Sequence, residues 1–277
     1  MASITARVPQ VDWSKGFDRH WNDGNPAVTH AFNALSFIFP QGEQFFIQVV
    51  REASQKLEHD KYPELVKDVK AFITQESAHT YQHQQYNSQL EQQGYKNVVH
   101  NYMRRLQMQA HKRLSPLTKL ALVSGYEHYT AILGNYLLNN PQMIDRADVD
   151  MALIWGWHSA EETEHKAVCF DLYKAMGGGW LRRILAFLFA TIDFNIIYAR
   201  LYMNLLRHDG CLKPVRLFKT LRQYFSFFYG RKGIMWHMIG YGFLYLSPGF
   251  HPWNNNNRAL LNAWLSKNRP RLKEVNN

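Results

Sequence analysis

The stretch from His158 to His165 places three side chains that commonly bind metal ions on one side of a helix. His158, Glu162 and His165 are spaced by four and then three residues, so a helix would align them along one face. Apolar residues continue this face before and after the three, which indicates that the face is buried. A buried ionised glutamate between two imidazoles is costly unless a cation compensates its charge. The stretch therefore predicts a metal site inside the protein.

Three earlier segments carry glutamates on apolar helix faces of their own. Glu76 precedes His79 by three residues, and Glu43 and Glu127 are single glutamates on separate helical segments. The order along the chain is Glu, Glu-x-x-His, Glu, Glu-x-x-His, which in four-helix bundles builds a site for two metal ions. Each motif alone is common on solvated helix faces, so the prediction rests on their joint occurrence. The predicted ligands are Glu43, Glu76, His79, Glu127, His158, Glu162 and His165.

The donor atoms indicate which metal ions the site would hold. Carboxylates offset the charge of two divalent ions, and imidazole nitrogens favour iron over magnesium or calcium. We therefore expect two iron ions, with manganese as the alternative.

His83 lies one turn after His79 on the same face, where it would contact a ligand or simply fill the core. His128 points away from Glu127 on its helix, so we expect that it is not a ligand.

The ligand motifs require four long helices, and the sequence predicts an all-α fold. Pro40 and Gly42 are expected to break the apolar run before them, so that the first ligand-bearing helix starts at Gly42. Ser115 and Asp148 are suitable N-terminal caps for the third and fourth helices, and the triple glycine at 177–179 ends the fourth. No segment of any length alternates polar and apolar residues as a strand would. The expected ranges are 42–58, 64–92, 115–138 and 148–177.

We expect three regions: an irregular lead-in at 1–25, a four-helix bundle with a di-metal core at 26–178, and additional C-terminal helices at 179–277. The apolar segment 184–206 is long enough to span a bilayer. It contains Asp193 and Arg200, however, which are costly in hydrocarbon. A buried or interfacial helix packed outside the four ligand helices is therefore the favoured prediction.

The net charge of +10 is concentrated near the C-terminus, where residues 207–277 carry twelve Lys or Arg against Asp209 and Glu274. A solvated basic surface, an anionic membrane surface and an acidic partner all fit this excess. No nucleic-acid-binding motif accompanies it. Residues 1–14 lack the apolar core of a signal peptide, and two cysteines form no disulfide framework. We expect a cytoplasmic protein, with peripheral binding at the inner membrane face as the alternative.

The ligand order resembles the ferritin-like di-iron carboxylate superfamily, and the added His158 resembles the seven-ligand site of bacterial di-iron arylamine N-oxygenases. Over most of its length, including Pro-Gly-Phe-His-Pro-Trp at 248–253, the sequence is similar to a bacterial family called predicted metal-dependent hydrolases. The resemblance to the di-iron proteins, including the N-oxygenases, implies that Glu43, Glu76 and His79 hold one iron and that Glu76 and Glu162 bridge the two irons. It implies that the second iron is held by Glu127, His158, Glu162 and His165. The basic region after residue 179 has no counterpart in the N-oxygenases, so their arylamine substrate is not implied.

Three classes of function remain open at this point. The leading hypothesis is a di-iron oxidoreductase that uses dioxygen to hydroxylate, desaturate or N-oxygenate an apolar or aromatic small molecule, including a lipid-derived one. The second is a two-metal hydrolase of an ester or phosphoester. The third is a non-catalytic iron-binding or membrane-associated protein. The sequence specifies no electron donor, and a homodimer is compatible with it.

Overall fold

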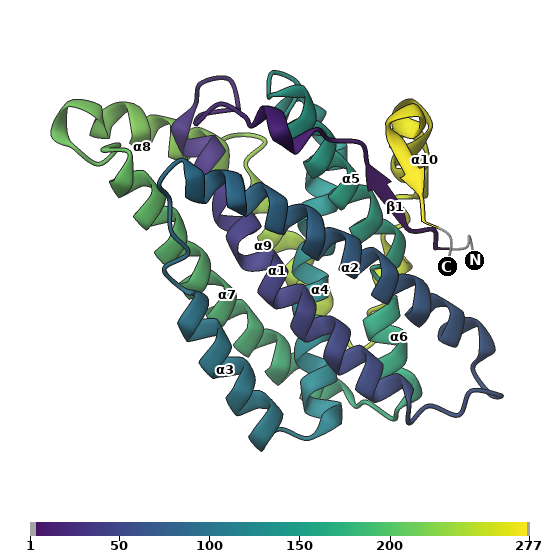
Figure 1. The fold of residues 1–277 in the computed structure, drawn as a ribbon. Helices are drawn as coiled ribbons and strands as arrows, with labels where there is room; N and C mark the ends of the chain where they lie inside the picture. The colour runs from purple at the N-terminus through teal and green to yellow at the C-terminus, as the bar shows by residue number, and fades with distance from the viewer. Residues whose placement is uncertain (1–3, 276–277) are drawn as a thin grey trace.

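Four long helices carry the predicted ligands and lie alongside one another in the computed structural model, which describes residues 4–275 (Figure 1). They are α1 (Pro26–Ser54), α2 (Pro63–Gln92), α4 (Pro116–Asn139) and α5 (Val149–His165). Contacts of α1 with α2, α2 with α5, α5 with α4 and α4 with α1 close the group into a bundle. The predicted all-α fold class is confirmed. Residues 1–3 of the predicted lead-in and 276–277 of the predicted C-terminal region lie outside the described residues.

Side-chain caps and prolines define where these helices start. The side chain of Ser115 accepts a hydrogen bond from the Thr118 amide, and that of Asp148 accepts from the amides of Asp150 and Met151. Proline occupies the first turn of α1, α2 and α4, where its missing amide costs no helical hydrogen bond. The predicted caps at Ser115 and Asp148 are therefore confirmed.

The predicted start of the first ligand helix at Gly42 is wrong, because α1 runs without interruption through Pro40. A proline inside a helix leaves the carbonyl four residues earlier without its donor. Here that carbonyl belongs to Ser36, and the side-chain amide of Asn87 on α2 donates to it at 2.8 Å. The neighbouring carbonyl of Phe37 likewise accepts from the Asn97 side chain at 2.9 Å. These two bonds from outside α1 allow it to continue past the proline.

The predicted fourth helix is divided in two. α5 ends at His165, and a separate helix, α6 (Val168–Ala175), continues to the glycines. The division lies at Lys166, whose buried amino group donates to the Asn255 carbonyl and the Asn257 side chain, each at 2.7 Å. Lys166 thus ties the end of the ligand-bearing helix to the C-terminal region.

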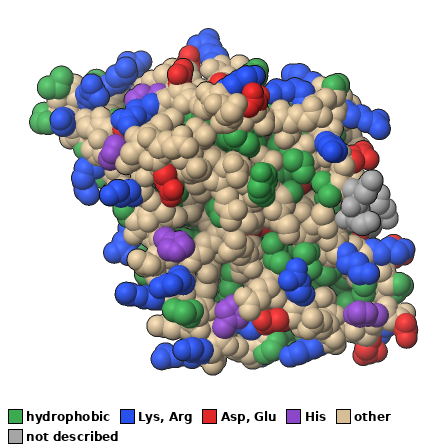
Figure 2. Space-filling model, viewed as in Figure 1, with side chains coloured by type: hydrophobic (Ala, Val, Ile, Leu, Met, Phe, Trp, Pro, Cys, Tyr) green, Lys and Arg blue, Asp and Glu red, His purple; other side chains and the backbone are tan. Residues whose placement is uncertain are grey.

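The remaining elements surround the bundle (Figure 1). α7 packs on α1 and α4, α8 on α1, and α9 on α4. The two chain ends meet in an antiparallel pair in which Arg7 lies opposite Glu274. In Figure 2, Lys and Arg side chains line the left edge, where Figure 1 places α3, α7 and α8. The helices are α3 (His100–Arg113), α7 (Trp180–His208), α8 (Pro214–Tyr229), α9 (Ile234–Tyr245) and α10 (Arg258–Asn268); the 3₁₀ turns are Trp13–Lys15, Pro141–Met143, Pro252–Asn254 and Arg269–Arg271; the strands are β1 (Arg7–Pro9) and β2 (Leu272–Glu274).

Along α1, α2 and α4, the polar ligand residues lie between two buried apolar clusters, and those of α5 lie between one cluster on α5 and the other on α6. On α2, for example, Phe72 belongs to one cluster and Tyr86 to the other, with Glu76 and His79 between them. The clusters close the bundle at both ends of the polar segment. They therefore exclude water from the two directions along the bundle axis.

Candidate metal centre

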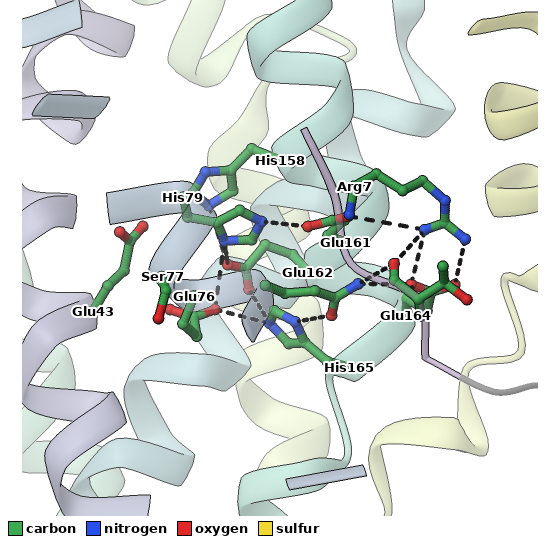
Figure 3. Close-up of polar contacts among 12 residues, drawn as sticks. Arg7, Glu43, Glu76, Ser77, His79, His158, Glu161, Glu162, Glu164 and His165 are labelled. Atoms are coloured by element: carbon green, nitrogen blue, oxygen red, sulfur yellow. Dashed lines mark hydrogen bonds and ion pairs between the residues drawn. The ribbon is translucent and has the colours of Figure 1, made fainter. Parts of the chain in front are cut away.

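The seven predicted ligand side chains converge at the centre of the bundle, and each is at most 4% exposed. Glu43 comes from α1, Glu76 and His79 from α2, Glu127 from α4, and the remaining three from α5. Figure 3 shows the carboxylates and imidazoles from α1, α2 and α5 turned toward one another. The i, i+3 spacing in α2 and α5 lets a single helical turn present both a carboxylate and an imidazole.

The potential ligand atoms form two main groups. Glu43, His79 and His158 make one and Glu76, Glu127 and His165 the other, with the ligand atoms inside each group within 4.8 Å of one another. This geometry has room for an ion in each group.

Two carboxylates lie between the groups. Glu162 Oε1 lies 3.1 Å from His158 Nε2, and Glu162 Oε2 lies 3.4 Å from His165 Nε2. Glu76 Oε1 is 3.4 Å from His79 Nδ1 and 3.3 Å from His165 Nε2. Glu76 and Glu162 thus occupy the positions that bridging carboxylates would take between two ions.

The chemistry of the unpaired atoms fits bound cations. Among the described residues, fifteen buried side-chain nitrogen or oxygen atoms have no hydrogen-bond partner, and nine of them belong to these seven side chains. Buried polar groups are otherwise almost always paired. In each of the three histidines, only the nitrogen that faces the centre is unpaired. The seven residues present therefore fit the binding of metal ions.

The outward-facing nitrogen of each histidine is held by a specific neighbour. His79 Nε2 lies 3.1 Å from Glu161, His165 Nδ1 lies 2.9 Å from Gln75 Oε1, and His158 Nδ1 lies 2.9 Å from His83 Nε2. Such partners fix the tautomer, so that the inward nitrogen keeps its lone pair for a metal. All three imidazoles are thereby oriented before any ion binds.

His158 lies in a different group from the one that the N-oxygenase resemblance implies. It joins Glu43 and His79, whereas the resemblance places it with Glu127 and His165. Its ring stacks on the His79 ring at 4.2 Å between centroids and bonds to His83, so it is held on the α2 side. The resemblance therefore does not predict how the histidines are shared between the two groups.

His83 contacts His158 rather than the metal-facing atoms. From His83 a chain of hydrogen bonds runs to Ser36 Oγ at 2.9 Å and on to Asn87 Oδ1 at 2.8 Å. This is the same Asn87 that caps the Ser36 carbonyl next to Pro40. His128, which we predicted not to be a ligand, faces α9 and lies 3.0 Å from the Tyr241 carbonyl.

Four residues that support the ligands were not predicted from the sequence. Glu161 bonds His79 and accepts a hydrogen bond from the Arg7 amide at 2.8 Å (Figure 3). Gln75 bonds His165 and donates a hydrogen bond to Glu164 at 2.7 Å. The guanidinium of Arg7 lies 3.1 Å from Glu164. The presence of three glutamates within residues 161–164 was a signal, since one helix face cannot hold them all. No pattern in the sequence around Arg7 indicated that this residue of β1 would contact Glu161 and Glu164.

The buried carboxylates and imidazoles have strongly displaced pKa values. Burial, together with the neighbouring carboxylates, raises the pKa of Glu43 and Glu76, and raises that of Glu127 to about 7. Burial lowers the pKa of His79 to about 3 and that of His158 to about 4. Two groups of the site shift the other way. Burial lowers the pKa of His165, but the Glu162 carboxylate raises it well above its usual value, and burial raises the pKa of Glu162, but His165 lowers it well below its usual value. His79 and His158 are therefore neutral and ready to bind a metal, whereas Glu43, Glu76 and Glu127 need cations to stay ionised.

A further group of candidate ligands lies near the end of α7. The carboxylate of Asp209 accepts from His20 at 2.6 Å, from His30 at 2.9 Å and from Tyr95 at 2.8 Å. Arg19 adds an ion pair at 3.1 Å. Because these partners already satisfy the carboxylate, we assign this group a structural role in joining the N-terminal segment to α7.

Two apolar cavities reach the predicted ligands. The larger, of about 900 Å³, borders Glu43 and Glu162 and extends between α1, α3, α4 and α7. The smaller, of about 330 Å³, borders His158 and is lined by residues of α1, α4, α5, α7, α8 and α9. Both volumes lie in the range of about 300–1,000 Å³ that is usual for small-molecule sites. An apolar molecule in either cavity would lie next to the bundle centre.

The fold and the buried His and Glu groups define a helical, metal-dependent protein. A family model described as "Predicted metal-dependent hydrolase" matches residues 5–256, and the chain belongs to that family. The overall similarity noted from the sequence is thus confirmed, and a metal-dependent enzyme is indicated. No curated protein matches the chain. No solved structure matches it either.

Proposed function

We propose that the protein is a non-haem di-iron oxidoreductase of the ferritin-like type that uses dioxygen. The observation that carries the proposal is the convergence of four glutamates and three histidines, in the order Glu, Glu-x-x-His, Glu, Glu-x-x-His, on one buried centre. This donor set suits iron or manganese and matches the di-metal carboxylate bundles. Two iron ions held there would supply electrons for the activation of dioxygen and so for hydroxylation, desaturation or N-oxygenation.

The protein's own residues would orient the ligands and keep water away. Glu161, Gln75 and His83 fix the three imidazoles, and the apolar clusters close the bundle on either side. The cavity beside Glu43 and Glu162 is lined mainly by apolar and aromatic side chains such as Phe46. This lining favours an apolar or aromatic substrate over a charged one.

Iron binding and reaction with dioxygen test the proposal directly. Metal-free protein is loaded with ferrous iron without oxygen and then mixed with oxygenated buffer while near-ultraviolet absorption is followed. We expect two irons per chain and a new absorption band. Glu76→Ala should lose both, whereas Glu91→Ala, an exposed glutamate on the same helix, should keep them. Wild-type protein that binds iron without any spectral response to oxygen would contradict the proposal.

Two-metal hydrolysis is the second candidate, and the description of the matching family favours it. Two divalent ions can activate a water molecule for attack on an ester or phosphoester. The experiment is turnover of p-nitrophenyl esters and phosphoesters by protein loaded with zinc or manganese. Turnover that Glu76→Ala abolishes, in a protein without the iron chromophore, would assign hydrolysis instead of oxidation.

A further inference from the structure

α7 carries an apolar stripe that no other described element covers. Each member lies three, four or seven residues from another member, so they share one face of the helix. The opposite face packs on α1 and α4 through buried side chains such as Ala190 and Leu201. The exposed stripe consists of Leu181, Leu185, Leu188, Phe189, Ile192, Ile196 and Met203.

Among the described residues, α7 is the one helix whose length and composition would allow it to cross a membrane, with a mean hydropathy of 1.6 over its most apolar window. One third of that window is buried in the protein, and Asp193 within it accepts hydrogen bonds from Tyr102 and Tyr126. A helix attached to a bundle along one side cannot be surrounded by lipid. Its geometry suits a helix that lies in the plane of a membrane surface.

The exposed apolar surface continues from α7 onto α8 and α9, because side chains of all three helices line the smaller cavity together, among them the exposed Leu188 of α7 and Phe243 of α9. Among the described residues, eighteen of the twenty-three exposed large hydrophobic side chains lie within 180–244. The most exposed include Val215 at 96%, Phe218 at 81% and Phe243 at 69%. Soluble monomers rarely expose apolar area on this scale without a partner. We call this surface, formed by residues 180–244, the α7–α9 face.

The charges on the α7–α9 face identify the kind of partner. Within residues 180–244, the only acidic residues are Asp193 and Asp209, both of which have buried, hydrogen-bonded carboxylates. A second copy of the chain would bring these positive charges against one another. An anionic bilayer instead offers negative head groups and an apolar interior. The exposed basic residues are Arg182, Arg200, Arg207, Lys213, Arg216, Lys219, Arg222, Arg231 and Lys232.

The larger cavity opens on this same face. Leu181, Leu185 and Phe189 line the cavity and are themselves 62%, 60% and 47% exposed. Their side chains therefore form both the outer rim of the cavity and part of the exposed stripe. Arg113 and Arg182 also line the cavity and are exposed. An apolar chain could pass from the rim toward Glu43 while an anionic head group stays beside the arginines.

We propose that the α7–α9 face binds the surface of an anionic lipid bilayer and that the larger cavity takes up a single-chain lipid with an anionic head group from it. The proposal of membrane binding depends only on the α7–α9 face and not on the proposed function. Identification of that lipid as the substrate rests on the proposed function. The chain would extend toward the Glu43 side of the metal centre, and the head group would remain at Arg113 and Arg182.

Co-sedimentation with vesicles tests membrane binding. The protein should bind phosphatidylglycerol vesicles at least about tenfold more strongly than phosphatidylcholine vesicles, because each basic residue near an anionic surface favours binding. The triple variant Arg216→Glu, Lys219→Glu, Arg222→Glu should lose at least about tenfold in affinity. Its matched control is Lys56→Glu, Lys67→Glu, Lys70→Glu, in which exposed lysines of α2 and the turn before it are reversed.

Two outcomes would overturn membrane binding. One is equal, negligible binding of the wild type to both vesicle types at low salt. The other is a stable dimer in analytical ultracentrifugation that does not bind anionic vesicles, which would assign the face to a second copy.

The double variant Phe218→Ser, Phe225→Ser should also bind anionic vesicles weakly, because both side chains are exposed on α8.

Fluorescence of cis-parinaric acid, a fatty acid, tests lipid uptake in zinc-loaded protein, where no redox chemistry is needed. Gly42 lines the cavity, and a Cβ added there meets no atom within 4 Å, so Gly42→Phe fills the cavity without a backbone clash. It should weaken fatty-acid binding at least about tenfold. Gly249→Phe, which also adds its Cβ in open space, is the matched control and should bind as the wild type does.

The head-group site has its own variant. Arg182→Glu should weaken binding of the fatty acid but not of the alcohol with the same chain, measured by displacement of the probe. Unchanged fatty-acid binding by Gly42→Phe would overturn uptake into this cavity. Lipid binding in a protein whose iron does not react with dioxygen would remove the proposed function and leave the lipid site in place.

Discussion

At the scale of single residues, the polar partners of the histidines matter as much as the metal-facing atoms. Glu161 is fully buried, holds His79 and is itself anchored by the Arg7 amide. Removing such a partner typically weakens metal binding by about 10–100-fold. We expect Glu161→Ala to weaken metal affinity by this factor in a competition assay with a chelator, while Glu91→Ala leaves it unchanged. Equal affinities for the two variants would show that His79 needs no such support.

Protonation of Glu127 should link metal binding to pH. In the metal-free protein, burial raises the pKa of Glu127 from 4.5 to about 7. A group with a raised folded-state pKa stabilises the fold below its unfolded pKa, and this contribution is lost as pH rises through the folded value. We therefore expect the free energy of unfolding of the metal-free wild type to fall by on the order of 1–3 kcal/mol, relative to that of Glu127→Gln, as pH rises from 4.5 to 7.5.

Metal binding should have the opposite dependence, because a ligand carboxylate must release its proton. The increase in melting temperature that metal causes in the wild type should grow as pH rises from 5.5 to 7.5. Thermal melts with metal and with chelator measure it. An increase that shrinks over this range would argue against Glu127 as a ligand.

The convergence of the seven side chains was predictable from the sequence because it depends on helix periodicity and on residue type, both of which are local. Glu76 and His79, for example, must share a face on any helix. The contacts of Arg7 and Gln75 were not predictable, since they join segments more than eighty residues apart in the chain. Those contacts follow from tertiary packing, which no short pattern encodes.

At the scale of elements, α1 and α2 depend on each other at Pro40. Proline was expected to end the helix because it removes an amide donor, and that reasoning fails here because Asn87 on α2 replaces the donor. The same side chain ends the hydrogen-bond chain that starts at His158. Asn87 therefore has two effects: it allows α1 to continue past Pro40, and it helps to orient His158.

We expect Asn87→Ala to lower the free energy of unfolding by about 1–3 kcal/mol, because the Ser36 carbonyl is left without a partner. Chemical denaturation measures this loss. Gln84→Ala, an exposed position on the same helix, should change stability by less than about 0.5 kcal/mol. If the two variants are equally stable, another group must satisfy the carbonyl next to Pro40.

At the scale of the whole molecule, Asp209 connects distant parts of the chain. Hydrogen bonds from His20, His30 and Tyr95 lower its pKa, against the effect of burial, which raises it. Breaking such a buried, charged network typically costs about 3 kcal/mol. We expect Asp209→Asn to lower the unfolding free energy by about this amount with metal content unchanged. Loss of metal together with stability would indicate that the centre and this network are coupled.

The pairing of β1 with β2 has a consequence for how the protein opens. The amide of Arg7 donates to Glu161, and Arg7 lies opposite Glu274 in the strand pair, so one short path leads from the histidine ligands to both ends of the described chain. Amide hydrogen exchange at the terminal strands should therefore report on an event deep in the bundle. Bound metal should slow exchange at Arg7 and at its strand partners, and chelation should release them together as one cooperative opening unit.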